Sequence, residues 1–538
     1  MCTMTRSTFR NDEDGAATVL SLFIFLMIIM VCGVGIDLMR HDNLRIRVQN
    51  VSDAAALSAA RVNGTFDSES LVRDYFAKSG IQASLRDVDV TNTGTVKTVQ
   101  IETSQPVSTL FMGLVGIPEL PVRTLAQAVQ DARPVEVSLV LDISSSMNSS
   151  NRLPRLKTAV RKFADEVVTA NPAAPVDFVS VNVVPYSLTV NPGSLSQYFT
   201  IAGKHSYRDC AWFETSDYTA LGIPTSNTYE RYSHMADGSS RYANGVVTLP
   251  MCPDHTISPY LSTPQQVTNA VDALSGWDGT GIDIGAKWGL AMLDPSFRPM
   301  VDDMITGGTV DANLSGRPYD FGASQKVLIV MSDGENDSQR DLHAGMREGL
   351  SPIWRNVSTG DYFVLVRDGR VSLPIGVTID AESRWYVEKT DQIRRSPDVD
   401  NSDTSTDWDY VAAEMIQLTW PEVFNITRTN DLYSRWFEKA REDGYLTAAE
   451  ARYYRNPLDM NRITETATNQ RLKDICALAT QSGIDVYAIS FDPPSTLARQ
   501  TLADCASTPD HFFSVQGDQI TAAFASIAAT INAVRLTQ

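Results

Sequence analysis

The segment VEVSLVLDISSSMNSS, Val135 to Ser150, decides the fold. It begins with an apolar run that ends at an aspartate, and serines follow that aspartate closely. The near-continuous apolar run VEVSLVLD predicts a strand buried on both faces. Alternate positions of an extended loop point the same way, so Asp142, Ser144 and Ser146 can converge on one point. Oxygen ligands of this kind suit Mg²⁺, Mn²⁺ or Ca²⁺, and the alternative interpretation is a polar turn or a helix cap.

The same apolar texture recurs further along the chain and alternates there with helical patterns. VDFVSVNVVPY, KVLIVMSDG and IDVYAISFD are near-continuous apolar runs, HFFSV is a shorter one, and PRLKTAVRKFADEVVTA is amphipathic. A closing helix is predicted from apolar residues at steps of three and four: Ile520, Phe524, Ile527, Ile531 and Val534. This alternation predicts an α/β fold with a doubly wound, mostly parallel sheet that binds ligands at the carboxyl ends of its strands.

Two stretches interrupt the alternation within 134–538. The first, at about 189–265, is rich in Tyr, Ser, Thr and Pro, and the second, at about 343–465, is charged and dense in Trp and Tyr. We interpret both as large insertions rather than strands of the sheet. The remaining segments together have the size of one ordinary α/β domain.

The N-terminal region contains a segment that is too apolar for a globular domain. Ala16 to Ile36 is 21 residues long and carries no charge, which matches the length that crosses a bilayer. A cleaved signal peptide is the alternative, but its apolar region is usually shorter and no A-x-A-like site follows here. We therefore expect a cytoplasmic tail over 1–15 and a retained transmembrane helix over 16–36.

The residues after this span predict a helix followed by a small sheet. Neither Pro nor Gly interrupts 37–62, so the membrane helix is expected to continue outward as a rod of about 70 Å in all. VDVTNTG, TVKTVQIETS and LPVRTLAQAVQ alternate apolar and polar residues as short strands do. Residues 37–131 are thus predicted to form a helical stalk with a small α+β module, which resembles a pilin in its pattern.

Four of the six cysteines lie well beyond the apolar segment: Cys210, Cys252, Cys476 and Cys505. None has a C-x-x-C or His-paired spacing, so zinc is not expected. Four cysteines allow three pairings, and proximity in the sequence favours Cys210–Cys252 and Cys476–Cys505, with four free buried thiols as the alternative. Two disulfides would place this region in an oxidising compartment outside the cytoplasm.

Charge and motifs limit the classes of function. The net charge of −19 argues against nucleic acid as a partner, because phosphate binding requires clustered Lys and Arg. The sequence contains no G-x-S-x-G elbow and no Walker-type phosphate loop, and its six histidines are scattered singly. We therefore expect a non-enzymatic binding protein. The alternatives are a purely structural scaffold and, further off, a metal-dependent hydrolase.

Two later loops join the D-x-S-x-S segment in a known pattern. DGTGIDIGAKWG places Thr280 in a Gly-flanked loop that opens a predicted helix, and KVLIVMSDGEND ends a predicted strand at Asp333. The combination resembles the von Willebrand factor A domain and its metal-ion-dependent adhesion site. The resemblance implies a Mg²⁺ ion (or Mn²⁺ or Ca²⁺) surrounded by Asp142, Ser144, Ser146, Thr280 and Asp333. In that family the hydroxyls coordinate directly, an aspartate often acts through water, and an acidic ligand of the partner completes the octahedron.

A narrower resemblance covers most of the chain. The order of DGAATVLSLFIFLMIIMVCGVGIDLMR, VQNVSDAAALSAA and an A domain is similar to that of TadG-like proteins of tight-adherence (Flp) pilus assembly. IDIGAKWGLAMLDP, CALATQSGIDVYAISFD and LADCASTPDHFFSVQ, with a terminal helix ending VRLTQ, are similar to the family's own pattern. Related pseudopilins are cut after a glycine with glutamate five residues on. Here Gly15 is followed by Leu20 at that place, so permanent anchoring is expected.

The TadG-like resemblance carries expectations about place and partners. It implies a single-pass protein of the bacterial inner membrane whose large C-terminal region lies in the periplasm or is exposed at the cell surface. Its partners would be other envelope or pilus proteins, pilins and pseudopilins among them, that present an acidic ligand. The expected function is cation-dependent protein binding in pilus assembly or adhesion. A structural pilus scaffold without a functional metal site is the alternative.

Overall fold

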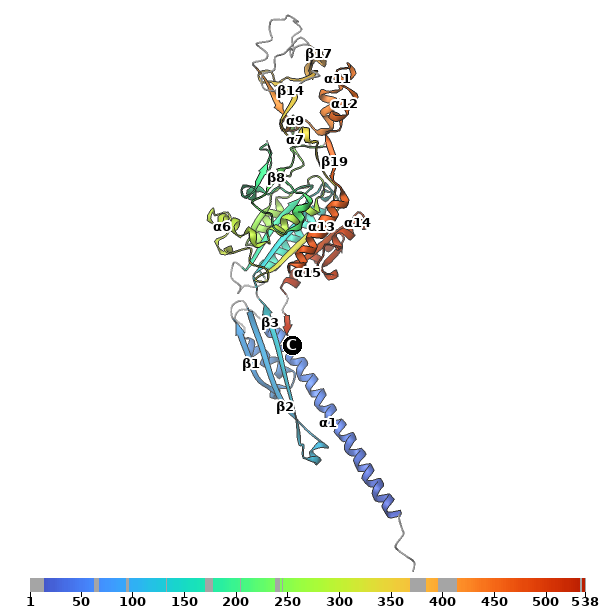
Figure 1. The fold of residues 1–538 in the computed structure, drawn as a ribbon. Coiled ribbons are helices and arrows are strands. Elements are labelled where there is room, and N and C mark those ends of the chain that lie inside the picture. Colours follow the sequence, from blue (N-terminus) through green and yellow to red (C-terminus); the bar gives the residue numbers. More distant parts are fainter. Residues whose placement is uncertain are drawn as a thin grey trace, which may run out of the picture. The chain divides into compact units, whose positions relative to one another are not determined.

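The computed structural model describes residues 14–61, 67–92, 96–131, 133–169, 178–203, 205–237, 242–243, 245–367, 384–394, 414–532 and 535–537. The chain forms two compact units (Figure 1). The first comprises Met1–Arg133, Asn171–Ala174 and Asn532–Gln538, and the second comprises Pro134–Ala170 and Pro175–Ile531. In the order of the chain, the second unit is therefore inserted into the first.

The first unit is built around one long helix, α1 (Asp14–Arg61). It has 48 residues, which corresponds to about 70 Å, the length expected for a span that continues outward as a stalk. One stretch of it is long and apolar enough to cross a membrane, judged by its length and composition. The C-terminal half carries small buried residues, among them Ala55, Ala56 and Ala59, which pack in the core of this unit.

Four antiparallel strands and a short helix complete the first unit. The sheet has the order β1-β2-β3-β22, and its elements are β1 (Leu85–Asn92), β2 (Val96–Ser108), β3 (Glu119–Asp131) and β22 (Arg535–Thr537), with α2 (Ser68–Lys78) packed on α1 and β1. The last strand differs from the prediction, because the sequence analysis assigned 535–537 to the end of the terminal helix. That helix, α15 (Gln519–Ile531), ends earlier, and Arg535 pairs with Val129 of β3, whose edge would otherwise be unpaired. The predicted helical position Val534 lies outside the described residues.

The second unit contains a six-stranded sheet whose order establishes the fold. The order is β11-β5-β4-β12-β20-β21, with β4 (Val135–Asp142), β5 (Val179–Tyr186), β11 (Ser258–Leu261), β12 (Gln325–Ser332), β20 (Asp485–Phe491) and β21 (Phe512–Val515). All neighbours are parallel except β11, which runs antiparallel to β5. Numbered along the chain, this order is 3-2-1-4-5-6, that of the doubly wound fold. The predicted fold class, a von Willebrand factor A-like α/β domain behind an N-terminal helix, is confirmed.

Helices cover both faces of this sheet. One face packs against α3 (Arg152–Thr169), α4 (Pro264–Asp272) and α15, and the other against α5 (Ile282–Ala291), α13 (Glu465–Gln481) and α14 (Thr496–Ala503), with α6 (Arg298–Thr306) in the same layer. Because successive side chains of a strand point to opposite faces, Leu139 and Val140 of β4 enter two different cores. This two-sided burial explains the uninterrupted apolar runs in the sequence.

The range 189–265, predicted as an insertion, contains one strand of the main sheet. β11 escaped prediction because it is a short edge strand that contains Pro259, and its Tyr260 has a positive φ of 49°. The other strands that the structure describes in this range are β6 (Thr200–Ala202), β7 (Ala211–Trp212), β8 (Thr228–Arg231), β9 (Tyr242–Ala243) and β10 (Val246–Val247). Apolar side chains from here and from the second insertion share one hydrophobic cluster, in which Trp212 and Trp436 are buried.

The range 343–465 contributes a sheet of its own. Five strands have the order β17-β16-β15-β14-β18, namely β14 (Leu350–Asn356), β15 (Tyr362–Arg367), β16 (Arg384–Val387), β17 (Gln392–Arg394) and β18 (Met415–Thr419). Its helices are α7 (Ala344–Arg347), α9 (Trp420–Ile426), α10 (Leu432–Trp436), α11 (Glu438–Glu442) and α12 (Ala448–Arg455). β13 (Gln339–Leu342) pairs with β19 (Leu458–Ile463), so the chain leaves and re-enters through an antiparallel strand pair.

Both expected cysteine pairs are disulfide-bonded in the structure. Cys210 and Cys252 have Cα atoms 5.8 Å apart and close the first inserted region. Cys476 on α13 is bonded to Cys505, two residues beyond the end of α14, with Cα atoms 5.1 Å apart. Consecutive helices on one face of a parallel sheet are neighbours, which brings the second pair within bonding range.

Candidate metal site at the carboxyl edge of the sheet

The candidate site lies where the direction of winding reverses. In the observed strand order the reversal falls between β4 and β12, and ligand sites of doubly wound folds lie outside the carboxyl ends of the strands at this place. Asp142 is the last residue of β4, and Asp333 immediately follows β12. The topology therefore brings together two aspartates that are far apart in the sequence.

The serines of the D-x-S-x-S loop connect the two strand ends. The Ser146 hydroxyl donates to Asp333 Oδ1 at 2.6 Å, and the Ser144 hydroxyl lies 3.4 Å from the same oxygen. The two hydroxyl oxygens are 2.7 Å apart. The Ser144 backbone N–H donates to Asp142 Oδ1 at 2.7 Å. Four of the five predicted ligands thus form one hydrogen-bonded cluster, as the alternating pattern suggests.

Asp142 is fully buried, and its environment opposes its negative charge. Burial, followed by the nearby charge of Asp333, raises the pKa of Asp142 to about 7. Hydrogen bonds from Ser332 and Ser144 act in the opposite direction, and the Ser332 hydroxyl lies 2.7 Å from Asp142 Oδ2. Ser332 is not among the residues predicted from the sequence, although its place directly before Asp333 at a strand end is a signal that could have found it.

Arg152 is a second residue of the site that was not predicted from the sequence. It is the first residue of α3, and its Nη1 lies 2.8 Å from Asp333 Oδ2. The same guanidinium lies 3.4 Å from Asp492 Oδ2, which follows β20. Burial raises the pKa of Asp333, and the Ser146 hydrogen bond and the Arg152 charge oppose that rise. The arginine therefore supplies a positive charge beside one of the two carboxylates.

Thr280, the fifth predicted ligand, lies beside this cluster. Its backbone N–H donates to Asp337 Oδ2 at 2.9 Å, and its carbonyl accepts the Asp337 N–H at 2.7 Å. These bonds tie the loop before α5 to the loop after β12. A methyl group placed on Gly334 would lie 3.4 Å from Thr280 Oγ1, which puts the hydroxyl against the residue next to Asp333.

The donor set fits a hard divalent cation. Two carboxylates and neighbouring hydroxyls offer oxygen ligands, which Mg²⁺, Mn²⁺ and Ca²⁺ prefer. Among the residues that the structure describes, no group of three or more His, Cys, Asp or Glu side chains could hold a metal ion. A cation at this site would therefore depend on the serine and threonine hydroxyls as much as on the two aspartates.

One family model matches the N-terminal helix. Residues 15–62, a range that includes all of α1 except its first residue, match the Tad family model of Flp pilus-assembly TadE/G-like proteins. No curated protein matches the chain. The strand order of the second unit defines the class of protein: a von Willebrand factor A-like α/β protein with a long N-terminal helix. Within that class, the N-terminal segment of this chain is TadE/G-like, as the sequence predicted.

Solved structures of pilus proteins are similar to the chain at low scores. The von Willebrand factor domain of the type V pili tip protein Mfa5 from Porphyromonas gingivalis has 14% identity and a TM-score of 0.30, over 74% of this chain and 95% of that one. The pilus adhesin SpaC from Lactobacillus rhamnosus GG has 13% identity and a TM-score of 0.30, over 83% and 33%. The adhesive tip pilin GBS104 from Group B Streptococcus agalactiae has 10% identity and a TM-score of 0.29, over 74% and 100%. The fold assignment rests on the strand order and not on these likenesses.

Proposed function

We propose that this chain is a membrane-anchored component of Flp (tight-adherence) pilus assembly or adhesion that binds a partner protein through a divalent cation. The TadE/G-like match over 15–62 supports the pilus system. The observation that supports the cation site is the convergence of Asp142, Ser144, Ser146 and Asp333 at the switch point of the sheet.

The proposed cation is Mg²⁺, and Mn²⁺ and Ca²⁺ are the alternatives. Asp142, Ser144, Ser146 and Thr280 would supply oxygens, and Asp333 would act directly or through water. Mg²⁺ keeps several waters and near-octahedral geometry, so such a site retains a position for a carboxylate of the partner. The partner would then be an envelope or pilus protein, such as a pilin or pseudopilin, that presents an acidic side chain.

The proposed location is the inner membrane of a bacterium, with 1–15 in the cytoplasm and everything after the 16–36 span in the periplasm or at the cell surface. The two disulfides support a location of the second unit outside the cytoplasm, because disulfides persist in oxidising compartments. We further propose that the binding domain comprises 134–538 apart from the last strand, which the structure assigns to the stalk module.

Calorimetric titration of the full chain in detergent with Mg²⁺ and Mn²⁺ tests the proposal. Asp142→Ala removes a buried negative charge at the point of convergence and should abolish metal binding. Ser145→Ala is the matched control, because Ser145 lies in the same loop but is exposed. Equal binding by the wild type and Asp142→Ala would refute the cation site. Capture of purified pilins should in turn require both the metal and Asp142.

A structural scaffold without a functional metal site is the second candidate. One observation favours it, since the Arg152 guanidinium already neutralises Asp333 at 2.8 Å. A buried carboxylate needs a charged partner or a metal, and the guanidinium is such a partner without a metal. The same titration separates the two candidates, because a scaffold should show no metal binding while its capture of pilins persists.

A further inference from the structure

The hairpin between β2 and β3 ends in an apolar tip that is exposed. Its sequence, TLFMGLVGIP over 109–118, carries no charged side chain. Leu110 is 61% exposed, Leu114 is 78% exposed and Val115 is 55% exposed. Ile117 adds a further exposed apolar side chain at 42%. Four exposed apolar side chains in one short tip differ from the singly scattered apolar residues of an ordinary soluble surface.

The tip is attached to α1 at the C-terminal end of the apolar span. A methyl group placed on Gly33 would lie 2.2 Å from Phe111 Cγ, so a glycine at this helix position is what allows the Phe111 ring to rest on the helix. One turn later, the buried carboxylate of Asp37 accepts the backbone N–H groups of Leu110, Phe111 and Met112 at 2.8, 2.8 and 2.9 Å. The position of the tip along α1 is thereby fixed.

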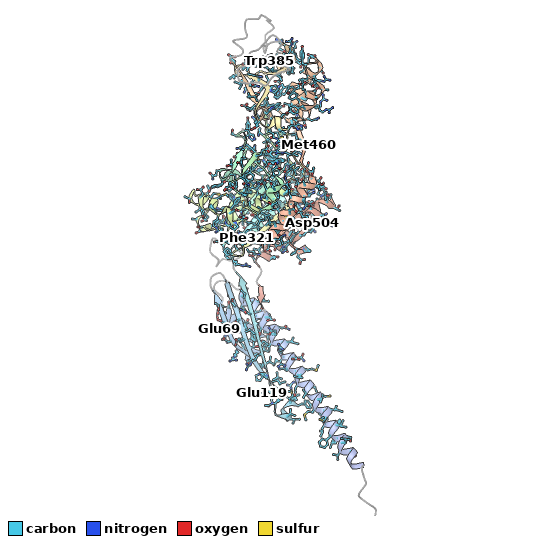
Figure 2. The ribbon with its side chains drawn as sticks, viewed as in Figure 1. Glu69, Glu119, Phe321, Trp385, Met460 and Asp504 are labelled. Carbon is cyan, nitrogen blue, oxygen red and sulfur yellow. A yellow bond between two sulfur atoms is a disulfide. The ribbon has the colours of Figure 1, made fainter. Side chains whose placement is uncertain are left out.

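The next turn of α1 holds the two strands just behind the tip. Arg40 Nη1 donates to the Ser108 carbonyl of β2 at 3.2 Å. His41 Nε2 lies 3.3 Å from the Pro121 carbonyl of β3. The hairpin stem is therefore level with the first polar turn after Ile36, and the tip is level with Gly33, inside the apolar segment. Figure 2 labels Glu119, the first residue of β3 and the first charged residue after the tip.

We propose that this tip inserts into the leaflet from which α1 emerges and forms a second membrane attachment. Gly33 precedes Ile36 by three residues, so the tip reaches about 5 Å below the last apolar residue of the span, given a rise of 1.5 Å per residue. Apolar segments that lie in a membrane interface penetrate to about this depth. A lipid surface is the occupant because Phe111 of the tip rests on Gly33, within the apolar segment of α1 that is long enough to cross a membrane.

The attachment has a consequence for the stalk. A single helix fixes neither its rotation about its own axis nor its tilt in a bilayer. A second contact at one side of α1 restricts both, because the tip can stay in the apolar region in only one rotational setting. The hairpin would thus orient the sheet of the first unit relative to the membrane. This inference rests on α1 crossing the membrane and does not depend on the cation site.

Depth-dependent quenching in vesicles tests the inference on the full chain. Cys2 and Cys32 are replaced by serine, and Leu114→Cys is labelled with an environment-sensitive nitrobenzoxadiazole probe. The protein is reconstituted in vesicles of equal amounts of phosphatidylethanolamine and phosphatidylglycerol, with or without a lipid that carries a nitroxide near the headgroup end of one acyl chain. Leu125→Cys is the matched control, because Leu125 is 56% exposed on the same hairpin. Leu125 lies six residues along β3 from Glu119, which corresponds to about 20 Å of extended strand.

The Leu114 probe should be blue-shifted and quenched about twofold by the nitroxide lipid, as expected for a side chain at the acyl boundary. The Leu125 probe should be neither shifted nor quenched. Leu114 is largely exposed, so labelling leaves the fold intact and a negative result is informative. A Leu114 probe that behaves like the Leu125 probe would overturn the proposal. A blue-shifted Leu114 probe that lipid nitroxides fail to quench would identify a protein contact and would overturn it equally.

Discussion

Replacing Arg152 by glutamine should tighten the binding of Mg²⁺ or Mn²⁺ about tenfold. Arg152 and a cation compete for the negative charge of Asp333, whose side chain is fully buried, while that of Arg152 is 20% exposed. A hydrogen bond to a charged group contributes about 1.5–3 kcal/mol, and partial exposure of the arginine places this one near the lower value. Each factor of ten in affinity corresponds to about 1.4 kcal/mol, which gives the expected change.

The same substitution should destabilise the metal-free protein. Without the guanidinium, Asp333 keeps the Ser146 hydroxyl at 2.6 Å but loses its 2.8 Å ion pair. A loss of about 1–2 kcal/mol in the free energy of unfolding is therefore expected in the presence of EDTA, and saturating metal should recover it. Calorimetric titration and urea unfolding measure the two effects independently.

Arg155→Gln is the matched control for this experiment. Arg155 lies on the same helix and pairs at 2.9 Å with Asp518, whose side chain is 89% exposed. It should change neither metal affinity nor apo stability by more than a few tenths of a kcal/mol, because exposed pairs contribute little. Unchanged metal affinity in Arg152→Gln would show that the guanidinium and the cation do not compete, and the charge argument for this site would be wrong.

Three further predictions concern the same domain. Replacing Cys476 and Cys505 by serine should lower the free energy of unfolding by about 3 kcal/mol in urea titrations, because the bond closes a separation of 29 residues; a loss within experimental error would contradict it. In EDTA, the free energy of unfolding should fall as the pH rises from about 4 to about 7. The pKa of Asp142 is about 7 in the folded state and has its ordinary value of 3.8 in the unfolded state, so between these values the folded protein holds a proton that the unfolded protein has released. This part of the pH dependence should be missing from Asp142→Asn in urea titrations across that range. Glu136→Gln should cost about 3–5 kcal/mol by the same assay, because Lys326 and Arg317 would lose their buried carboxylate partner; a loss under about 1 kcal/mol would show that the three groups are solvated.

The centre of the fold could be predicted from sequence because burial there leaves a strong signal. β4, β5, β12 and β20 are covered on both faces, so each is an almost uninterrupted apolar run. The edge strands lack this signal. β11 is four residues long and carries a proline, and β22 is three residues long and is defined by its pairing with β3. Pairings of this kind between distant segments leave no local pattern in the sequence.

The site shows the same division between local and distant signals. Asp142, Ser144 and Ser146 share one loop, and their alternation is visible in the sequence. Ser332 and Arg152 contact the two aspartates across the switch point. Ser332 could have been found from its place directly before Asp333, whereas Arg152 has no spacing that indicates its partner. Only the strand order brings Arg152 at the start of α3 next to the end of β12. The charge balance of the site therefore required the structure.

The pairing of β22 with β3 has a mechanical consequence. Both strands lead into the inserted domain from the same end of their ladder, since Arg535 lies opposite Val129 near the C-terminal end of β3. Tension applied to the second unit would pass covalently into β3, and it would pass from β22 into β3 only through the backbone pairing of the two strands. The three-residue β22 should slip before β3, which pairs with β2 along thirteen residues. Separation of β22 from β3 would then take up the first extension, while the covalent connection through β3 to α1 stays intact.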